Sequence, residues 1–181
     1  MTWKIDPAHS RIGFATKHMM ITTVRGSLAL AGGSLEFDEQ DPTRSRVEVQ
    51  LDAASVDTGS AARDSHLRSA DFLEADRYPR ITFRSTAIEP AGRGRFRLRG
   101  DLTIRDITRP VTLDTRLEGV VPNPQGGRRA GFSATATINR DDFGLTWNVA
   151  LEQGGWLVSK EIRVEVELAA VQVEQSASAA A

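Results

Sequence analysis

The chain has 181 residues, of which 40% are hydrophobic and 26% are charged, and its formal net charge is -1. Its length and apolar content fit one globular domain, and the near-neutral balance gives no reason to expect a nucleic-acid partner. It contains no cysteine, which excludes a disulfide framework, thiol catalysis and cysteine metal sites and favours the cytoplasm.

Residues 1–7 contain no apolar core of signal-peptide length. No run in the chain approaches the roughly 20 apolar residues of a membrane span. We therefore expect a cytoplasmic protein without a membrane span.

Alternation of apolar and polar residues with a period of two runs through most of the chain. Weaker alternation occurs at residues 11–18, 26–37, 80–86, 102–104, 111–120 and 130–139, and the clearest at 46–52, 93–99 and 161–168. This pattern is typical of a sheet with one dry and one wet face. Turn residues such as Gly32-Gly33 and the Pro-Asn-Pro-Gln-Gly-Gly run at 122–127 separate the segments. The sequence therefore predicts an all-β, antiparallel domain.

About eight strands with few interruptions favour closure into a barrel, because closure removes unpaired sheet edges. Such a barrel is either filled by side chains or holds one elongated small molecule. We expect this domain to span residues 1–172. Residues 173–181 show no pattern and are predicted to be a disordered tail.

One segment, residues 61–73, breaks the alternation and suits a short helix. Ser60 and Asp64 are the candidate helix caps. Tyr78-Pro79 then returns the chain to an extended form.

Three histidines raise the question of a metal or a catalytic site. His9, His18 and His66 lie on separate elements without the short spacings that place ligands on one face. We therefore predict no metal site. Asp57 and Asp64 could serve general acid–base catalysis, but short aspartates beside Gly59 and Arg63 are more typical of turns and helix starts.

A row of arginines at 93, 95, 97 and 99 could follow a phosphate backbone. Aromatic residues do not alternate with it on the same face, and acidic strands elsewhere balance it. The row is better interpreted as a solvated outer face. The apolar positions of the strands would point inward, to form either a solid core or the lining of a tunnel, and the pattern does not separate the two.

Four groups of residues together resemble one known family. They are Trp3, Ile5-Asp6, His9-Ser10, Ile12, Phe14, His18 and Gly26; then Asp57-Thr58-Gly59, Arg63-Asp64, His66-Leu67, Asp71-Phe72, Tyr78-Pro79 and Ile81-Thr82-Phe83; then Gly100, Leu102-Thr103-Ile104, Thr108 and Val111-Thr112-Leu113; and finally Asn139-Arg140 with Asp142-Phe143-Gly144. In this order they resemble the YceI-like proteins over residues 2 to about 171.

The resemblance implies an extended, lipocalin-like antiparallel barrel. Its long apolar pocket would bind a polyisoprenoid, such as an isoprenoid quinone, or a similar amphiphilic lipid, without catalysis and without a cofactor. The predicted lining is Ile12, Phe14, His18, Val47, Val49, Leu51, Ile81, Phe83, Leu102, Ile104, Leu113 and Phe132.

The polar head of such a lipid would remain near one mouth of the barrel. Arg63, His66 and Arg68 are the candidate head-group neighbours, because arginines offer charge-assisted hydrogen bonds; the alternative is that they partner Asp57 and Asp64. Two other functions stay open: an enzyme of isoprenoid or stress metabolism that uses His18 or His66 with a nearby aspartate, and a solid-core interaction module. A homodimer is compatible with the sequence.

Overall fold

The computed structural model describes residues 2–173, which form nine strands, one α-helix and three short 3-10 segments. The elements are β1 (Thr2–Ile5), η1 (Pro7–His9), β2 (Arg11–His18), β3 (Thr22–Glu36), η2 (Pro42–Arg44), β4 (Arg46–Asp57), α1 (Ala61–Arg68), β5 (Arg80–Pro90), β6 (Arg95–Ile104), β7 (Ile107–Pro122), β8 (Arg128–Asn139), η3 (Arg140–Phe143) and β9 (Glu161–Val173). No helix within residues 2–173 has the length and apolar content needed to cross a membrane.

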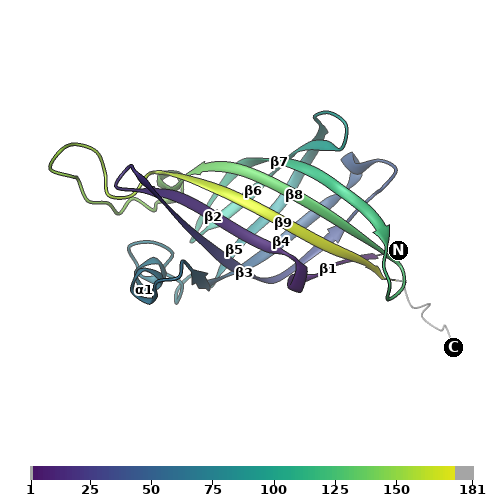
Figure 1. The fold of residues 1–181 in the computed structure, drawn as a ribbon, viewed down its shortest axis with the longest axis horizontal. Coiled ribbons are helices and arrows are strands. Elements are labelled where there is room, and N and C mark those ends of the chain that lie inside the picture. Colours follow the sequence, from purple (N-terminus) through teal and green to yellow (C-terminus); the bar gives the residue numbers. More distant parts are fainter. Residues whose placement is uncertain (1, 174–181) are drawn as a thin grey trace.

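Eight of the strands close into one antiparallel barrel. Their order is β3-β2-β9-β8-β7-β6-β5-β4, and the pairing of β3 with β4 completes the ring. The short β1 is an additional strand that pairs with both β9 and β3. The barrel is elongated, with β1 at one end and α1 together with the 144–160 loop at the other (Figure 1). We call these the β1 end and the α1 end. The predicted closed antiparallel barrel and its short helix are confirmed.

The structure differs from the sequence prediction in three strands. Residues 93–99 and 102–104 do not form separate elements, because β6 runs through Gly100 without a break. The four-residue β1 was too short for its alternation to be recognised. β9 continues to Val173, which pairs with Thr2, so one residue of the predicted tail belongs to the barrel. The rest of that prediction, residues 174–181, lies outside the described residues.

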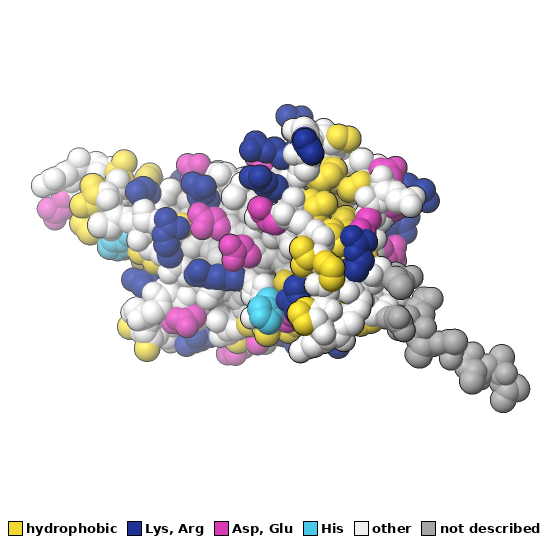
Figure 2. Space-filling model, turned by 45° about the vertical axis from the view of Figure 1, so that its right-hand side comes forward, with side chains coloured by type: hydrophobic (Ala, Val, Ile, Leu, Met, Phe, Trp, Pro, Cys, Tyr) yellow, Lys and Arg dark blue, Asp and Glu magenta, His cyan; other side chains and the backbone are white. Residues whose placement is uncertain are grey.

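The outer face of the barrel is charged, and cations and carboxylates are interspersed on it (Figure 2). Arg93, Arg95, Arg97 and Arg99 are all exposed. Arg99 lies 3.2 Å from Glu89 on the neighbouring strand. The arginine row is therefore a solvated surface, as the sequence indicated.

The apolar core is concentrated at the two ends of the barrel. One cluster surrounds the fully buried Ala53 and Phe143 near α1, and the other surrounds Trp3 and Ala170 near β1. Between them, inward residues such as Leu113 are only half-buried. A strand residue that faces inward and still meets solvent indicates that the interior is not filled.

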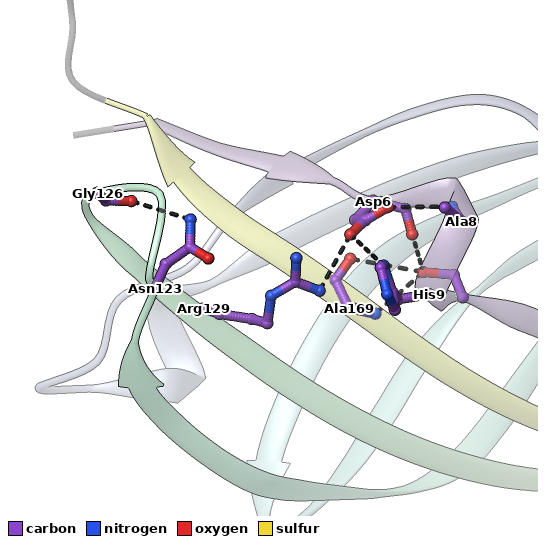
Figure 3. A network of polar contacts seen from close by, with 8 residues as sticks. Asp6, Ala8, His9, Asn123, Gly126, Arg129 and Ala169 are labelled. Carbon is purple, nitrogen blue, oxygen red and sulfur yellow. Dashed lines mark hydrogen bonds and ion pairs between the residues drawn. The ribbon is translucent and has the colours of Figure 1, made fainter.

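At the β1 end, a polar network ties the start of the chain to β8 (Figure 3). Asp6 accepts a hydrogen bond from the backbone N–H of Ala8 at 3.0 Å. Its other carboxylate oxygen lies 2.7 Å from His9 Nδ1 and 3.0 Å from the Arg129 guanidinium. In the neighbouring turn, Asn123 donates to the carbonyl of Gly126. The hydrogen bond with His9, supported by Ala8 and Arg129, lowers the pKa of Asp6.

We expect Asp6→Asn to lower the melting temperature at neutral pH by a few degrees. Because the pKa of Asp6 is lowered in the folded protein, its stabilising effect is present above the unfolded pKa of about 3.9. The effect is lost as the pH falls through the lower, folded value. Thermal melts of both proteins between pH 7 and pH 2.5 should therefore converge in acid. A difference that stays constant across this range would contradict an ionic role for Asp6.

Candidate functional site

The barrel encloses two apolar cavities. The larger has a volume of about 520 Å³ and lies toward the α1 end, and the smaller has a volume of about 180 Å³ and lies toward the β1 end. They share the lining residues Ile12, Leu51, Leu102, Ile138 and Val164. We call these five residues the waist, because they lie where the two cavities adjoin in one apolar interior. The solid-core alternative is therefore wrong: the inward side chains leave room for a ligand.

Each end of this space meets the surface. Lys17, Ala62 and Arg63 line the larger cavity and are exposed, so the cavity opens beside α1. The exposed Arg46, which follows η2, lines the smaller cavity. Apolar side chains are visible in a hollow toward the right-hand end of Figure 2. The interior thus holds two adjoining cavities that reach exposed residues near opposite ends of the barrel, and we call the two together the tunnel.

All twelve residues of the predicted lining face this tunnel. Ile12, Leu51 and Leu102 belong to the waist; Phe14, His18, Ile81 and Ile104 line the larger cavity; and Val47, Val49, Phe83, Leu113 and Phe132 line the smaller one. That they contact a ligand stays a prediction.

We call the opening of the larger cavity beside α1 the α1 mouth. Thr58, which follows β4, forms hydrogen bonds there with residues of α1. Ser60 caps α1 by accepting a hydrogen bond from Arg63 N, so of the two predicted caps Ser60 is the one used. Asp64 is buried and instead accepts hydrogen bonds from Thr58 N at 2.8 Å and from Thr58 Oγ1 at 2.5 Å. These bonds, together with the nearby charges of Arg63 and Arg68, lower the pKa of Asp64.

The three predicted head-group residues are placed differently. Arg63 lines the larger cavity and donates to Thr58 Oγ1 at 2.7 Å and to Thr58 O at 2.8 Å. His66 also lines it. Arg68 is not among the lining residues, and its charge acts on Asp64. The structure therefore brings two of the three residues to the cavity.

His66 is held in one orientation by its neighbours. Its Nε2 lies 2.9 Å from Asp71 Oδ2. Its ring meets Phe72 and Trp147 edge to face, with centroid distances of 5.1 Å and 4.5 Å. His18 lines the same cavity, whereas His9 belongs to the network at the β1 end. No cluster of three or more metal-ligating side chains occurs in the described part of the chain.

Sequence reasoning missed the most buried charge at this mouth. The Arg140 side chain is 3% exposed and donates hydrogen bonds to the carbonyls of Leu145, Trp147, Val158 and Ser159 at 2.5 to 3.2 Å. Burial lowers its pKa. Arg140 thus fastens both arms of the 144–160 loop to the barrel. It could have been found only as part of the late family motif, because the loop it holds has no alternation.

The charges that line the larger cavity are all positive. They belong to Lys17, Arg63 and Arg140, and the cavity also carries His18 and His66. Its lining contains no aspartate or glutamate. Such a lining favours an anionic or carbonyl oxygen on electrostatic grounds, because it contains positive charges and no carboxylate.

A closed antiparallel barrel with an apolar tunnel and a cationic mouth belongs to the class of barrels that bind small ligands. The chain is a member of the YceI-like family: the model of the YceI-like domain matches residues 3–170.

Individual proteins agree with this assignment. The protein YceI of Shigella flexneri is 40% identical over 145 residues, which are 79% of this chain and 75% of that protein. The crystal structure of BcnA from Burkholderia cenocepacia has a TM-score of 0.76 at 25% identity and covers 92% of this chain and 99% of that one. A polyisoprenoid-binding domain from Saccharophagus degradans shares the fold, with a TM-score of 0.69 at 13% identity over 96% of this chain and 99% of that one.

Proposed function

We propose that the protein binds a polyisoprenoid, an isoprenoid quinone or a similar long-chain amphiphilic lipid, and that it carries or stores this lipid without altering it. The observation that carries the proposal is the pair of adjoining apolar cavities inside the barrel, which share five lining residues. A tail that enters it gains roughly 25 cal/mol for each Å² of apolar area removed from water. The polyisoprenoid-binding neighbour supports the same class of ligand.

The head group of the lipid would lie at the α1 mouth and the tail would extend past the waist toward the β1 end. Arg63 and His66 line this mouth, and Lys17 and Arg140 add two more cations. Arg68 would act indirectly, through Asp64. This orientation puts the polar head against the cationic lining and the tail against apolar side chains.

A matched pair of ligands tests the head-group position. Geranylgeranyl diphosphate and geranylgeraniol carry the same tail, so their affinities differ only through the head. We expect Arg63→Gln to weaken the diphosphate about tenfold, because one charge-assisted hydrogen bond is worth about 1.5 kcal/mol or more. The alcohol should bind unchanged, and so should both ligands in Arg97→Gln on the outer face. Equal affinities for the diphosphate in Arg63→Gln and the unaltered protein would place the head elsewhere.

The enzyme alternative has one observation in its favour, the pairing of His66 with Asp71 at the cavity wall. The pair could act as a general base. Prolonged incubation with a bound prenyl ligand, followed by extraction, separates the two functions. The carrier proposal expects the ligand to be recovered unchanged; conversion that His66→Ala abolishes would establish catalysis.

The cytoplasmic location and the homodimer remain predictions. Cell fractionation would test the first, and light scattering of the purified protein would test the second. Neither result changes the binding proposal, which depends on the tunnel alone.

A further inference from the structure

Large apolar side chains are exposed together at the α1 end of the barrel. Of the seven exposed large hydrophobic residues in the described chain, five lie on two loops at this end; the other two, Val121 and Val173, lie at the β1 end. The exposed fractions reach 78% for Ile21 and 64% for Met20. We call this group the apolar rim: Met19, Met20, Ile21, Val149 and Trp156.

The apolar rim lies around the mouth of the larger cavity. Met19 N donates to Leu157 O at 2.8 Å, which joins the β2–β3 turn to the 144–160 loop. His18 and Leu157, the chain neighbours of Met19 and Trp156, both line the larger cavity. The 144–160 loop is the outermost element at this end in Figure 1, and apolar side chains gather there at the left of Figure 2.

The two loops are also depleted of charge. Residues 18–24 contain no formally charged side chain, and residues 143–159 contain only Glu152, in a chain with 26% charged residues. Soluble surfaces normally intersperse charges with isolated apolar residues. A cluster of exposed apolar side chains without charges therefore indicates a surface that meets an apolar partner.

The turn that carries the two methionines is strained. Met19 and Met20 have φ values of 50° and 65°, and Ile21 N donates to His18 O at 3.2 Å to close the turn. A turn with both central residues in this region favours Asn-Gly, and another residue costs about 1–2 kcal/mol per position. Methionine thus adds strain to the turn. Met20 contacts Gly155 of the 144–160 loop, but 64% of it stays exposed, so this contact accounts for only part of the side chain. Strain that persists at a surface points to function.

We propose that the apolar rim docks onto the surface of a lipid bilayer, with the mouth of the larger cavity facing the membrane. Flexible methionines and a tryptophan at loop tips suit shallow insertion at the water–lipid interface. The two protruding loops of the apolar rim can insert into a fluid lipid bilayer without a surface of matching shape. A second folded protein would instead need a continuous complementary surface of about 600 Å² or more on each partner. Transfer of a ligand through the mouth rests on the proposed function, but docking itself does not.

The double substitution M19N/M20G gives a test that preserves the fold, because Asn-Gly relaxes the turn while it removes two exposed apolar side chains. We expect the unaltered protein to float with phosphatidylcholine vesicles and the double variant to bind them at least tenfold more weakly. The variant should melt at the same temperature or higher. Val121→Asn, which removes an exposed apolar side chain at the β1 end, should leave vesicle binding unchanged.

Binding of geranylgeraniol in solution separates this proposal from the proposed function. M19N/M20G should bind it as the unaltered protein does, since neither methionine lines a cavity. Docking is overturned if the unaltered protein does not float with vesicles or if the double variant floats equally well. It is also overturned if light scattering shows a dimer that the double substitution converts to a monomer, because the rim would then cover a second copy.

Discussion

Leu102→Trp is expected to shorten the longest prenyl chain that the barrel accepts. Leu102 is one of the five waist residues, and it lines both cavities. An indole at this position would occupy the passage between the larger and the smaller cavity. A ligand that fits within the larger cavity would still bind, whereas a longer tail would be left outside the smaller one.

The effect on long ligands should be large. Each isoprene unit contains five carbons, and burial of a carbon contributes about 0.8 kcal/mol, so exclusion of one unit costs about 4 kcal/mol. We therefore expect at least a 100-fold loss of affinity for a ligand of eight isoprene units, with a change of less than about threefold for a ligand of two units.

Titration with prenyl alcohols of increasing length measures this profile. Thr112→Trp, which adds the same side chain to the exposed outer face of β7, serves as the control and should bind all lengths normally. If Leu102→Trp is folded and its length profile matches that of the control, the two cavities do not form one tunnel for the ligand.

Arg140→Met is expected to destabilise the protein more than any surface substitution. The change removes the Arg140 donor from four carbonyls of the 144–160 loop, of which only Val158 O keeps another side-chain donor, Asn148. A buried acceptor that loses its partner costs about 1–3 kcal/mol. Opening of the loop would let water reach some of these carbonyls. We therefore expect a net loss of about 3 kcal/mol, or roughly 6–12 °C in melting temperature for a domain of this size.

Arg140→Met should loosen the 144–160 loop in particular, in addition to lowering the stability of the whole domain. Limited proteolysis should cut Arg140→Met within residues 144–160 before the barrel strands, because Arg140 no longer fastens the loop. Arg140→Lys keeps the charge but offers fewer donors in a less rigid arrangement. The stability of this variant should therefore lie between that of the unaltered protein and that of Arg140→Met. A melting temperature and cleavage pattern equal to those of the unaltered protein would show that the loop is held by other contacts.

The strands and their inward faces could be predicted from the sequence because each strand has one wet and one dry side. At 161–168, for example, charged residues alternate with Ile, Val and Leu. This alternation places the apolar residues on the inward face of β9 and does not depend on the other strands. The same argument placed Phe83 and Leu113 in the interior. It could not decide whether the interior is hollow, because a tunnel and a core need the same residues inside.

The α1 mouth was predicted only in part, because long-range contacts organise it. Arg140 holds its loop through backbone carbonyls. Every residue has one, so the loop sequence does not indicate which carbonyls accept these hydrogen bonds. The Met19-Met20 turn was equally hidden, since neither residue is a turn signal. Arg63 and His66 could be named because they lie in a dense polar segment, whereas Lys17 reaches the same cavity from β2.

Native mass spectrometry of the protein purified from cells, combined with organic extraction, tests the binding proposal most directly. The proposal predicts a discrete added mass that corresponds to a prenyl chain and is recovered in the extract, or saturable uptake of a prenyl ligand by protein that has lost its cargo. A mass equal to that of the bare chain, together with no saturable uptake of prenyl ligands of any length, would contradict it.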